Sequence, residues 1–199
     1  MTVTDIGYAR GVSRWEPDAR GRLQAAALAL YGERGFEQTT VAEIARRAGL
    51  TERTFFRHFA DKREVLFYGS GTLQDLLVSA VAGAPATASP IGAVAVGLEA
   101  ITAMFTGRRE SSRQRQSVIN ANAELQEREL IKLASLASAL AGTLRERGVP
   151  DPAASLAAEA GIAVFKVAFG RWISEDSQLD LPQLMRESLG ELKTVTAGS

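Results

Sequence analysis

Apolar side chains recur along almost the whole chain at intervals of three and four residues, which is the repeat of one face of an α-helix. Nothing in the sequence shows the strict alternation of apolar and polar residues that a half-buried strand requires, and the helix formers Ala, Leu, Arg and Glu dominate. With 199 residues, of which 46% are hydrophobic, the chain can bury a sizeable core. The sequence therefore predicts an all-α globular protein.

Capping residues place the helices of the N-terminal part. A first helix is expected over 18–35, because Gly35 can take the left-handed conformation that closes a helix. The run Thr-Val-Ala-Glu at 40–43 has the form of a capping box for a short second helix, which Gly49 interrupts. A third helix follows over 51–59. Residues 61–64 repeat the capping pattern and predict a longer helix through Val81, which Gly69 and Gly71 can weaken or bend.

The C-terminal part is predicted to be a second set of helices, behind a proline-containing loop at 84–90. Asp151 is expected to cap a helix that has Pro152 in its first turn, and this helix is apolar on most faces, which predicts burial on both sides. Core stripes are Ile91, Val94, Leu98, Ile101 and Phe105, then Leu133, Leu136, Leu140 and Leu144, and in a last helix from about Asp180, Leu181, Leu184, Met185, Leu189 and Leu192.

The stretch 40–59 has the parts of a helix-turn-helix in the right order. Such a unit needs a short first helix with a small residue at the crossing point, a tight turn, and a second helix with polar side chains facing out. Ala45 and Gly49 meet the first two needs. On a helical wheel of the second helix, the inward face carries Phe55 and Phe59, the outward face Arg53 and Arg57, and the flanks Thr54 and Phe56.

Positive charge is concentrated in the same stretch, although the chain has a formal net charge of zero. From Arg46 to Arg63, six basic residues stand against only Glu52 and Asp61. Clustered Lys and Arg suit an anionic partner such as DNA. The alternative is a structural helical hairpin with solvated arginines.

These residues predict a specific set of DNA contacts. Arg53 is the candidate for a base contact, because a guanidinium can bond two acceptors of guanine at once. Phe56 can either meet sugar and phosphate or tuck against the first helix. Phosphate contacts are predicted for Arg57 and His58 near the end of the helix and for Thr40, Thr51 and Lys62 at helix starts, with Thr54 on the flank.

This part of the chain resembles the DNA-binding domain of the TetR family of repressors, through the run TVAEIARRAGLTERTFFRHF at 40–59 and DKREVL at 61–66. The resemblance covers about 20–67. The family usually has a small residue, often glycine, where Arg53 stands, and often a tyrosine where Phe56 stands. Arg53 therefore adds a donor, whereas Phe56 lacks the hydroxyl that would bond phosphate.

The resemblance implies a layout and a mode of action. The expected parts are an N-terminal arm, 1–17, that is flexible, a helix-turn-helix head, 18–67, and a helical ligand-binding and dimerisation body, 68–199, which begins with a connecting helix. Two copies would pair through 153–173 and 182–192. A small-molecule inducer in the body would move the two heads apart and release a palindromic DNA operator.

An apolar pocket in the body is predicted for this effector, with aromatic walls and a few polar anchors. The same aromatic residues can equally be plain core. The walls would be Met104, Phe105, Phe165, Phe169 and Trp172, and the anchors Gln116, Asn120 and Asn122.

Two other classes of function compete with a DNA-binding regulator. An enzyme lacks support: His58 is the single histidine and there is no cysteine, so neither a histidine metal site nor a thiol nucleophile can form, and the acidic pair Glu175 and Asp176 is explained by solvation. No metal or other cofactor is expected. The other class is a helical protein-interaction module without DNA binding, which would have the same apolar patterns and helix caps as a DNA-binding regulator. No run approaches the roughly 20 apolar residues of a membrane span, so a cytoplasmic protein without a membrane partner is expected.

Overall fold

The structure is a computed structural model that describes residues 18–174 and 179–197, so the predicted arm 1–17 lies outside the described residues. Every regular element in these ranges is helical, which confirms the all-α class. The elements are α1 (Ala19–Arg34), α2 (Val41–Arg47), α3 (Glu52–His58), the 3-10 turn η1 (Glu64–Phe67), α4 (Ser70–Ala82), α5 (Pro90–Ile101), the 3-10 turn η2 (Thr102–Phe105), α6 (Arg109–Asn120), α7 (Ala123–Glu146), α8 (Asp151–Ile173) and α9 (Leu181–Thr196).

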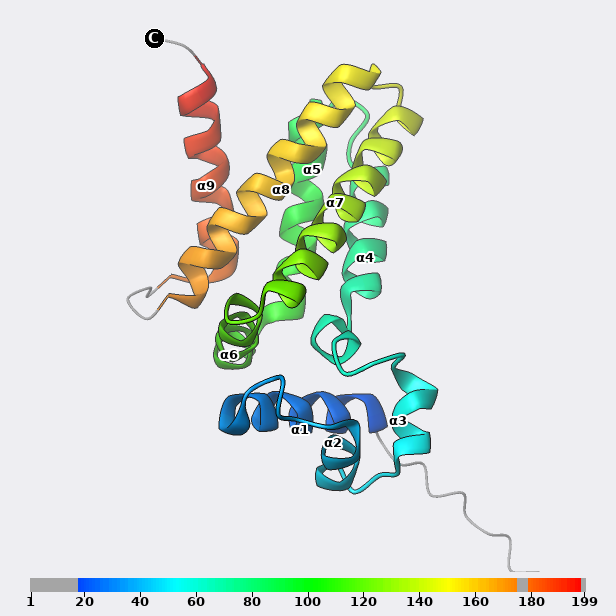
Figure 1. The fold of residues 1–199 in the computed structure, drawn as a ribbon. Helices are drawn as coiled ribbons and strands as arrows, with labels where there is room; N and C mark the ends of the chain where they lie inside the picture. Colours follow the sequence, from blue (N-terminus) through cyan, green and yellow to red (C-terminus); the bar gives the residue numbers. More distant parts are fainter. Residues whose placement is uncertain (1–17, 175–178, 198–199) are drawn as a thin grey trace, which may run out of the picture.

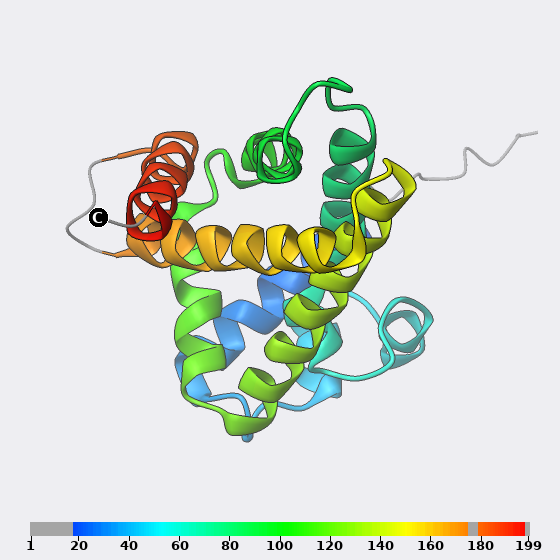
Figure 2. The ribbon, with the colours of Figure 1, turned by 90° about the horizontal axis from the view of Figure 1, so that it is seen from above.

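Helices α1, α2 and α3 form a small head at one end of the molecule, and α4, α5, α7, α8 and α9 form a larger body (Figure 1). Helix α8 lies at the centre of the body, packed against α5, α7 and α9. Seen from above, α9 and α4 lie on opposite sides of the body, toward the two ends of α8 (Figure 2). Helix α6 lies between the body and α1, where it can contact both.

Side chains cap the helices of the head, as predicted for α2 and α3. The Asp18 carboxylate accepts a hydrogen bond from the backbone N of Gly21 at 2.7 Å at the start of α1. Thr40 and Glu43 make both bonds of a capping box on α2, and Thr51 caps α3. Each cap satisfies amides that a helix start leaves without a partner, so the sequence fixes where these helices begin.

The long helix predicted from 61 to 81 is interrupted. Residues 64–67 make a single 3-10 turn, and α4 starts only after Gly69, whose φ of 91° is left-handed. Asp61 accepts the amide of Glu64 at 3.0 Å, but the Glu64 carboxylate turns toward α7 instead of closing a capping box. The prediction of one bent helix was therefore wrong, since η1 and α4 are separate elements.

The predicted cap of α8 is also wrong. Asp151 is the first residue of the helix rather than its cap, and Pro150 precedes it without a side-chain cap bond. The Asp151 carboxylate instead pairs with Arg145 at the end of α7. This exposed ion pair joins the end of α7 to the start of α8 and is expected to contribute little to stability.

Buried apolar side chains form two separate cores. The head core joins α1, α2, α3 and η1 with Val118 and Ile119 of α6 and Leu125 of α7. The body core lies among α4, α5, α7, α8 and α9. Helix α7 contributes to both, since its residues 136–144 belong to the body core. The corner between α6 and α7 therefore packs with the head.

Within the described residues, two helical stretches are long and apolar enough to cross a membrane, by length and composition only: Glu64–Ala82 and Asp151–Ile173. The pair Pro90–Phe105 and Arg109–Asn120 passes the same test only if it is counted as one span, and it is bent by 101°. The expectation that no stretch approaches this character was wrong. The first stretch is interrupted at Gly69. The second is α8, which packs against three helices of the body. We interpret its apolar character as packing surface for a bundle, because a helix that is apolar nearly all round needs neighbours on several sides.

Candidate nucleic-acid interface

Helix α3 is held from behind by two phenylalanines. Gly49, with φ of 68°, turns the chain after α2 and lets α3 cross it. Phe55 has no exposed surface and Phe59 is 6% exposed, and the centroids of their rings lie 5.6 Å apart. Both rings belong to the head core. The opposite face of α3 is therefore left for solvent or a ligand.

That outward face carries Arg53, Phe56 and Arg57, which are all exposed. Phe56 is 55% exposed, which favours the alternative that places its ring on the surface. Among the residues that the structure describes, neither guanidinium has a hydrogen bond or an ion pair. Two cations without an ion pair thus stand beside an exposed aromatic ring that contacts Phe55 from outside, an arrangement that suits phosphate and base edges.

Of the predicted threonines, Thr40 and Thr51 act as helix caps, and Thr54 lies in the first turn of α3. The Thr40 hydroxyl donates to Glu43 Oε2 at 3.0 Å, and the Thr40 backbone N donates to the same oxygen at 3.0 Å. These bonds hold the pKa of Glu43 below its usual value, so the carboxylate stays charged. The Thr51 and Thr54 hydroxyl oxygens lie 3.0 Å apart and form one hydrogen bond. The three hydroxyls therefore mark the exposed starts of α2 and α3.

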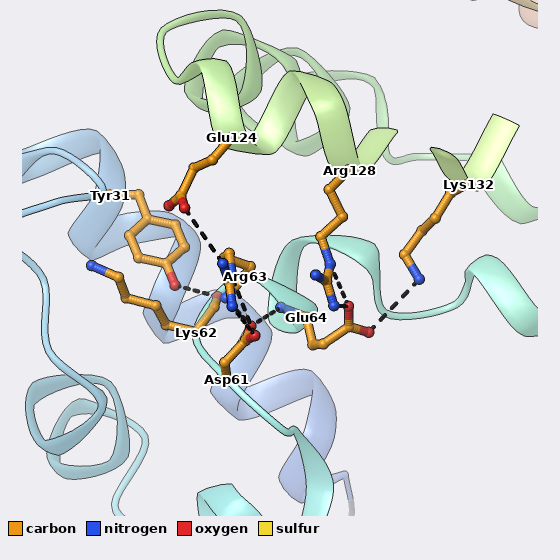
Figure 3. Close-up of polar contacts among 8 residues, drawn as sticks. All are labelled: Tyr31, Asp61, Lys62, Arg63, Glu64, Glu124, Arg128 and Lys132. Atoms are coloured by element: carbon orange, nitrogen blue, oxygen red, sulfur yellow. Dashed lines mark hydrogen bonds and ion pairs between the residues drawn. The ribbon is translucent and has the colours of Figure 1, made fainter. Parts of the chain in front are cut away.

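The position of the Lys62 side chain does not favour the predicted phosphate contact, because the side chain points into the head. Its Nζ donates to the carbonyl oxygens of Phe36, Glu37 and Thr39 at 2.8, 3.3 and 3.2 Å. An ammonium has three N–H donors, so these carbonyls take all of them. The Tyr31 hydroxyl in turn donates to the Lys62 carbonyl at 2.7 Å (Figure 3). Lys62 thus ties the loop between α1 and α2 to the segment after α3.

His58 also faces the head rather than a partner. Its Nδ1 accepts a hydrogen bond from Arg20 Nε at 3.3 Å, and its Nε2 is buried with no hydrogen bond among the described residues. Burial, followed by the charges of Arg57 and Arg20, holds the pKa of His58 below its ordinary value. The ring is therefore neutral at pH 7 and joins α3 to the start of α1.

The sequence reasoning missed Arg20 and Tyr31 as parts of this head. Arg20 bonds His58 and lies 5.9 Å from the ring centroid of Tyr68. Tyr31 supports Lys62, and burial raises its pKa well above the usual range. Both partnerships join residues about thirty positions or more apart in the chain, and no local pattern signals them.

The structure brings together most of the aromatic residues predicted for an effector pocket. Phe105 of η2 contacts Phe165, Phe169 and Trp172 of α8, with ring centroids 5.6–6.2 Å apart. Phe105, Phe165 and Phe169 are half-buried, and Met104 precedes Phe105 on the same turn. The four rings of Phe105, Phe165, Phe169 and Trp172 are called the aromatic cluster below.

The predicted polar anchors lie elsewhere. Gln116 donates to Asn120 Oδ1 at 3.1 Å and to Glu129 of α7 at 2.9 Å, and Asn122 donates to the Val118 carbonyl at 2.7 Å. Asn122 instead lines a hollow of about 330 Å³ between α1 and α6. The anchors therefore belong to the region near the head and not to the aromatic cluster.

Charged side chains do not gather into a metal site in the part of the chain that the structure describes: no group of three His, Asp or Glu could hold an ion. The acidic pair Glu175 and Asp176 lies outside the described residues.

Comparison with known proteins settles the family. The sequence model of the MftR C-terminal domain matches residues 88–197, more than half of the chain, and that of "bacterial regulatory proteins, tetR family" matches residues 23–68. The chain belongs to the TetR family. The second match lies over the capped head described above, so the helix-turn-helix and the family's DNA-binding domain coincide.

Curated TetR-family relatives match part of the chain. The regulator TcmR of Streptomyces glaucescens is 35% identical over 82 residues, 41% of this chain and 36% of TcmR. The repressor KstR2 of Mycobacterium tuberculosis is 43% identical over 47 residues, 24% of each protein. The matched segments thus span about a third of TcmR and a quarter of KstR2.

Solved TetR-family structures share the whole fold. FadR of Bacillus subtilis, in complex with stearoyl-CoA, has a TM-score of 0.61 at 20% identity, over 86% of this chain and 96% of FadR. The complex of SmeT, a repressor of Stenotrophomonas maltophilia, with triclosan has a TM-score of 0.64 at 19% identity, over 89% of this chain and 90% of SmeT. At such identities the likeness shows the fold alone.

Proposed function

We propose that this TetR-family protein is a cytoplasmic transcriptional repressor that holds a palindromic operator through α3 and releases it when a small molecule binds the body. The exposed basic face of α3, on a helix capped by Thr51 and backed by Phe55 and Phe59, is the observation that carries the proposal. Family membership supports a regulator over an enzyme or an interaction module.

The contacts divide by position on the head. Arg53, near the start of α3, is proposed to read a base edge, whereas Arg57 and the ring of Phe56 meet the DNA backbone. The starts of α2 and α3, marked by Thr40, Thr51 and Thr54, would face phosphates. Lys62 and His58 are proposed to position these groups from inside the head, and not to touch DNA.

Alanine variants of the two arginines test this division. Arg53→Ala is expected to cost about 1–3 kcal/mol in operator binding and to relax preference at one base position. Arg57→Ala is expected to weaken binding of all sequences alike and to lower the salt slope by about one. Fluorescence anisotropy with a panel of single-substituted duplexes at several salt concentrations measures both. Arg145→Ala removes another exposed guanidinium, at the end of α7 far from the head, and serves as the control. An unchanged base preference in Arg53→Ala contradicts the role.

A second copy of the chain is proposed to cover the outer face of α8. Leu156 and Val167 are 71% and 56% exposed and lie on the same side of this helix with Ala163 and Gly170. Small side chains in such a stripe let two helices approach closely. Sedimentation at micromolar concentration should give a dimer, and Leu156→Glu should shift it toward monomer. A monomeric wild-type chain is the contrary result.

The aromatic cluster is the proposed effector site, because four rings from η2 and α8 form the most aromatic part of the body. The complexes of FadR with stearoyl-CoA and of SmeT with triclosan support an apolar effector for this chain as well. Trp15→Phe leaves Trp172 as the single tryptophan. Its fluorescence should change on titration with stearoyl-CoA or triclosan, and Phe169→Ala should weaken the response. A flat signal with both probes, with no effect of either on DNA binding, contradicts this site for these ligands.

A further inference from the structure

The turn η1 is bound to the start of α7 by an ionic cluster. Arg128 Nε donates to Glu64 at 2.6 Å, a second nitrogen of Arg128 contacts the same oxygen, and Lys132 Nζ lies 3.7 Å from the other oxygen of Glu64. Arg63, at the preceding position, lies 3.4 Å from the carboxylate of Glu124 on the same helix (Figure 3). Three side chains of α7, one turn apart from each other, thus face two consecutive residues of the head.

Helix α6 also contacts the same turn, through Arg115. Arg115 Nε donates to the Leu66 carbonyl at 2.6 Å, and its Nη1 donates to Glu129 of α7 at 3.1 Å. The guanidinium carbon of Arg115 lies 5.2 Å from the ring centroid of Phe67, and Lys132 Nζ lies 5.6 Å from the same ring. Glu64, Arg115, Arg128, Glu129 and Lys132 are called the η1 junction below.

Helix α4, which connects head and body, does not hold the head rigidly. Gly69 separates η1 from α4 with a left-handed φ of 91°, and the side chains of α4 that are buried, Leu77 and Val81, belong to the body core alone. Helix α7 is continuous over 24 residues and has buried side chains in both cores. The rigid connection between the two cores therefore runs through α7, and the η1 junction is where the head is fixed to it.

We propose that the η1 junction is a positioning element that sets the angle of the head on the body, and thereby the spacing of the two half-sites that the dimer accepts. This inference rests on the proposed function. The junction holds η1, and α3 precedes η1 in the head, so a change in the angle of the head at the junction moves α3 relative to the body. Base pairs are spaced by about 3.4 Å, so a movement of α3 by a few ångströms is enough to change the half-site spacing by about one base pair. A loosened junction therefore accepts several half-site spacings.

Charge reversal and its rescue test the proposal. Arg128→Glu places two carboxylates together at the junction, and the double variant Glu64→Arg, Arg128→Glu restores an ion pair with the same net charge. Arg145→Glu is the matched control, because it reverses an arginine at the far end of the same helix, where its partner is Asp151 of α8. Circular dichroism and sedimentation first establish that each variant is folded and has the wild-type oligomeric state.

The first readout needs no DNA. The chain has no cysteine, so Gln38→Cys in the head and Thr87→Cys in the body give a single pair of spin-label sites. Labelled chain is diluted with excess unlabelled chain so that distances within one subunit are measured. We expect one narrow distance in the wild type, the Arg145→Glu control and the double variant, and a broad distribution in Arg128→Glu. An Arg128→Glu distribution as narrow as the wild type overturns the proposal.

The second readout is selection of duplexes from a randomised pool. We expect the wild type to enrich one half-site spacing, and Arg128→Glu to enrich at least two with the same half-site sequence and about tenfold weaker binding to the wild-type site, which the double variant restores. An Arg128→Glu selection identical to the wild type overturns the inference and leaves the proposed function intact. A wild-type chain that enriches no sequence overturns both.

Discussion

Phe55→Ala is expected to unfold the head, with a loss of about 3–5 kcal/mol in the free energy of unfolding. The Phe55 ring has no exposed surface and contacts Phe56 and Phe59, so its removal leaves a cavity beneath α3. The head core around it is small, and neighbouring side chains can fill such a cavity only in part. Specific DNA binding should be lost with the fold of the head.

The adjacent residue provides a matched comparison. Phe56→Ala removes the same ring from the next position, but 55% of this residue is exposed, so the expected loss in stability is below about 1 kcal/mol. DNA binding should still weaken, because the ring stands on the face proposed to meet the backbone. Chemical denaturation followed by circular dichroism, together with DNA titration, measures both effects. Equal destabilisation by the two variants would contradict the orientation of α3.

Lys62→Ala is expected to cost about 3 kcal/mol in stability, because three backbone carbonyls lose a charged donor at once. The loop between α1 and α2 would lose its tie to the segment after α3. Lys193→Ala, which removes an exposed lysine of α9, is the control and should be nearly neutral. Denaturant unfolding of the two variants gives the comparison.

The same variant separates two roles for Lys62. If the side chain acts inside the head, DNA binding of the folded fraction keeps the wild-type salt slope. If the ammonium contacts phosphate, Lys62→Ala remains stable and the slope falls by about one. A stable variant with a reduced slope therefore returns Lys62 to the DNA-contacting residues.

Features that depend on neighbours in sequence could be predicted, because a helix cap or a helical face is decided within about one turn. The capping box of Thr40 and Glu43 and the inward pair of Phe55 and Phe59 are of this kind. The head could therefore be placed from its sequence in some detail. The exposure of Arg53 followed from the same helical wheel.

Features that depend on distant partners could not be predicted. Lys62 has the character of a phosphate ligand until the carbonyls of Phe36, Glu37 and Thr39 lie beneath it. Glu64 has the spacing of a capping residue, yet Arg128, sixty-four positions later, takes its carboxylate. In both cases an ion pair or a charged hydrogen bond from another element outcompetes the local pattern.

In the body, too, features set by neighbours in sequence could be predicted and features set by distant partners could not. Phe165, Phe169 and Trp172 share one face of α8 by their spacing, and the structure places them together. Gln116 and Asn120 were grouped with them by residue type alone, but α6 turns both toward α7 and the head. Residue type predicts what a side chain can bind, whereas only the packing of helices determines which groups converge.

Selection of duplexes from a randomised pool by the full chain, followed by titration of the winning duplex against salt, tests the central claim most directly. We predict a palindromic sequence with two half-sites about one helical turn apart, a binding constant that falls steeply as salt rises, and loss of base preference at one position of each half-site in Arg53→Ala. Enrichment of no sequence at low ionic strength, or binding that ignores both salt and Arg53, contradicts the account.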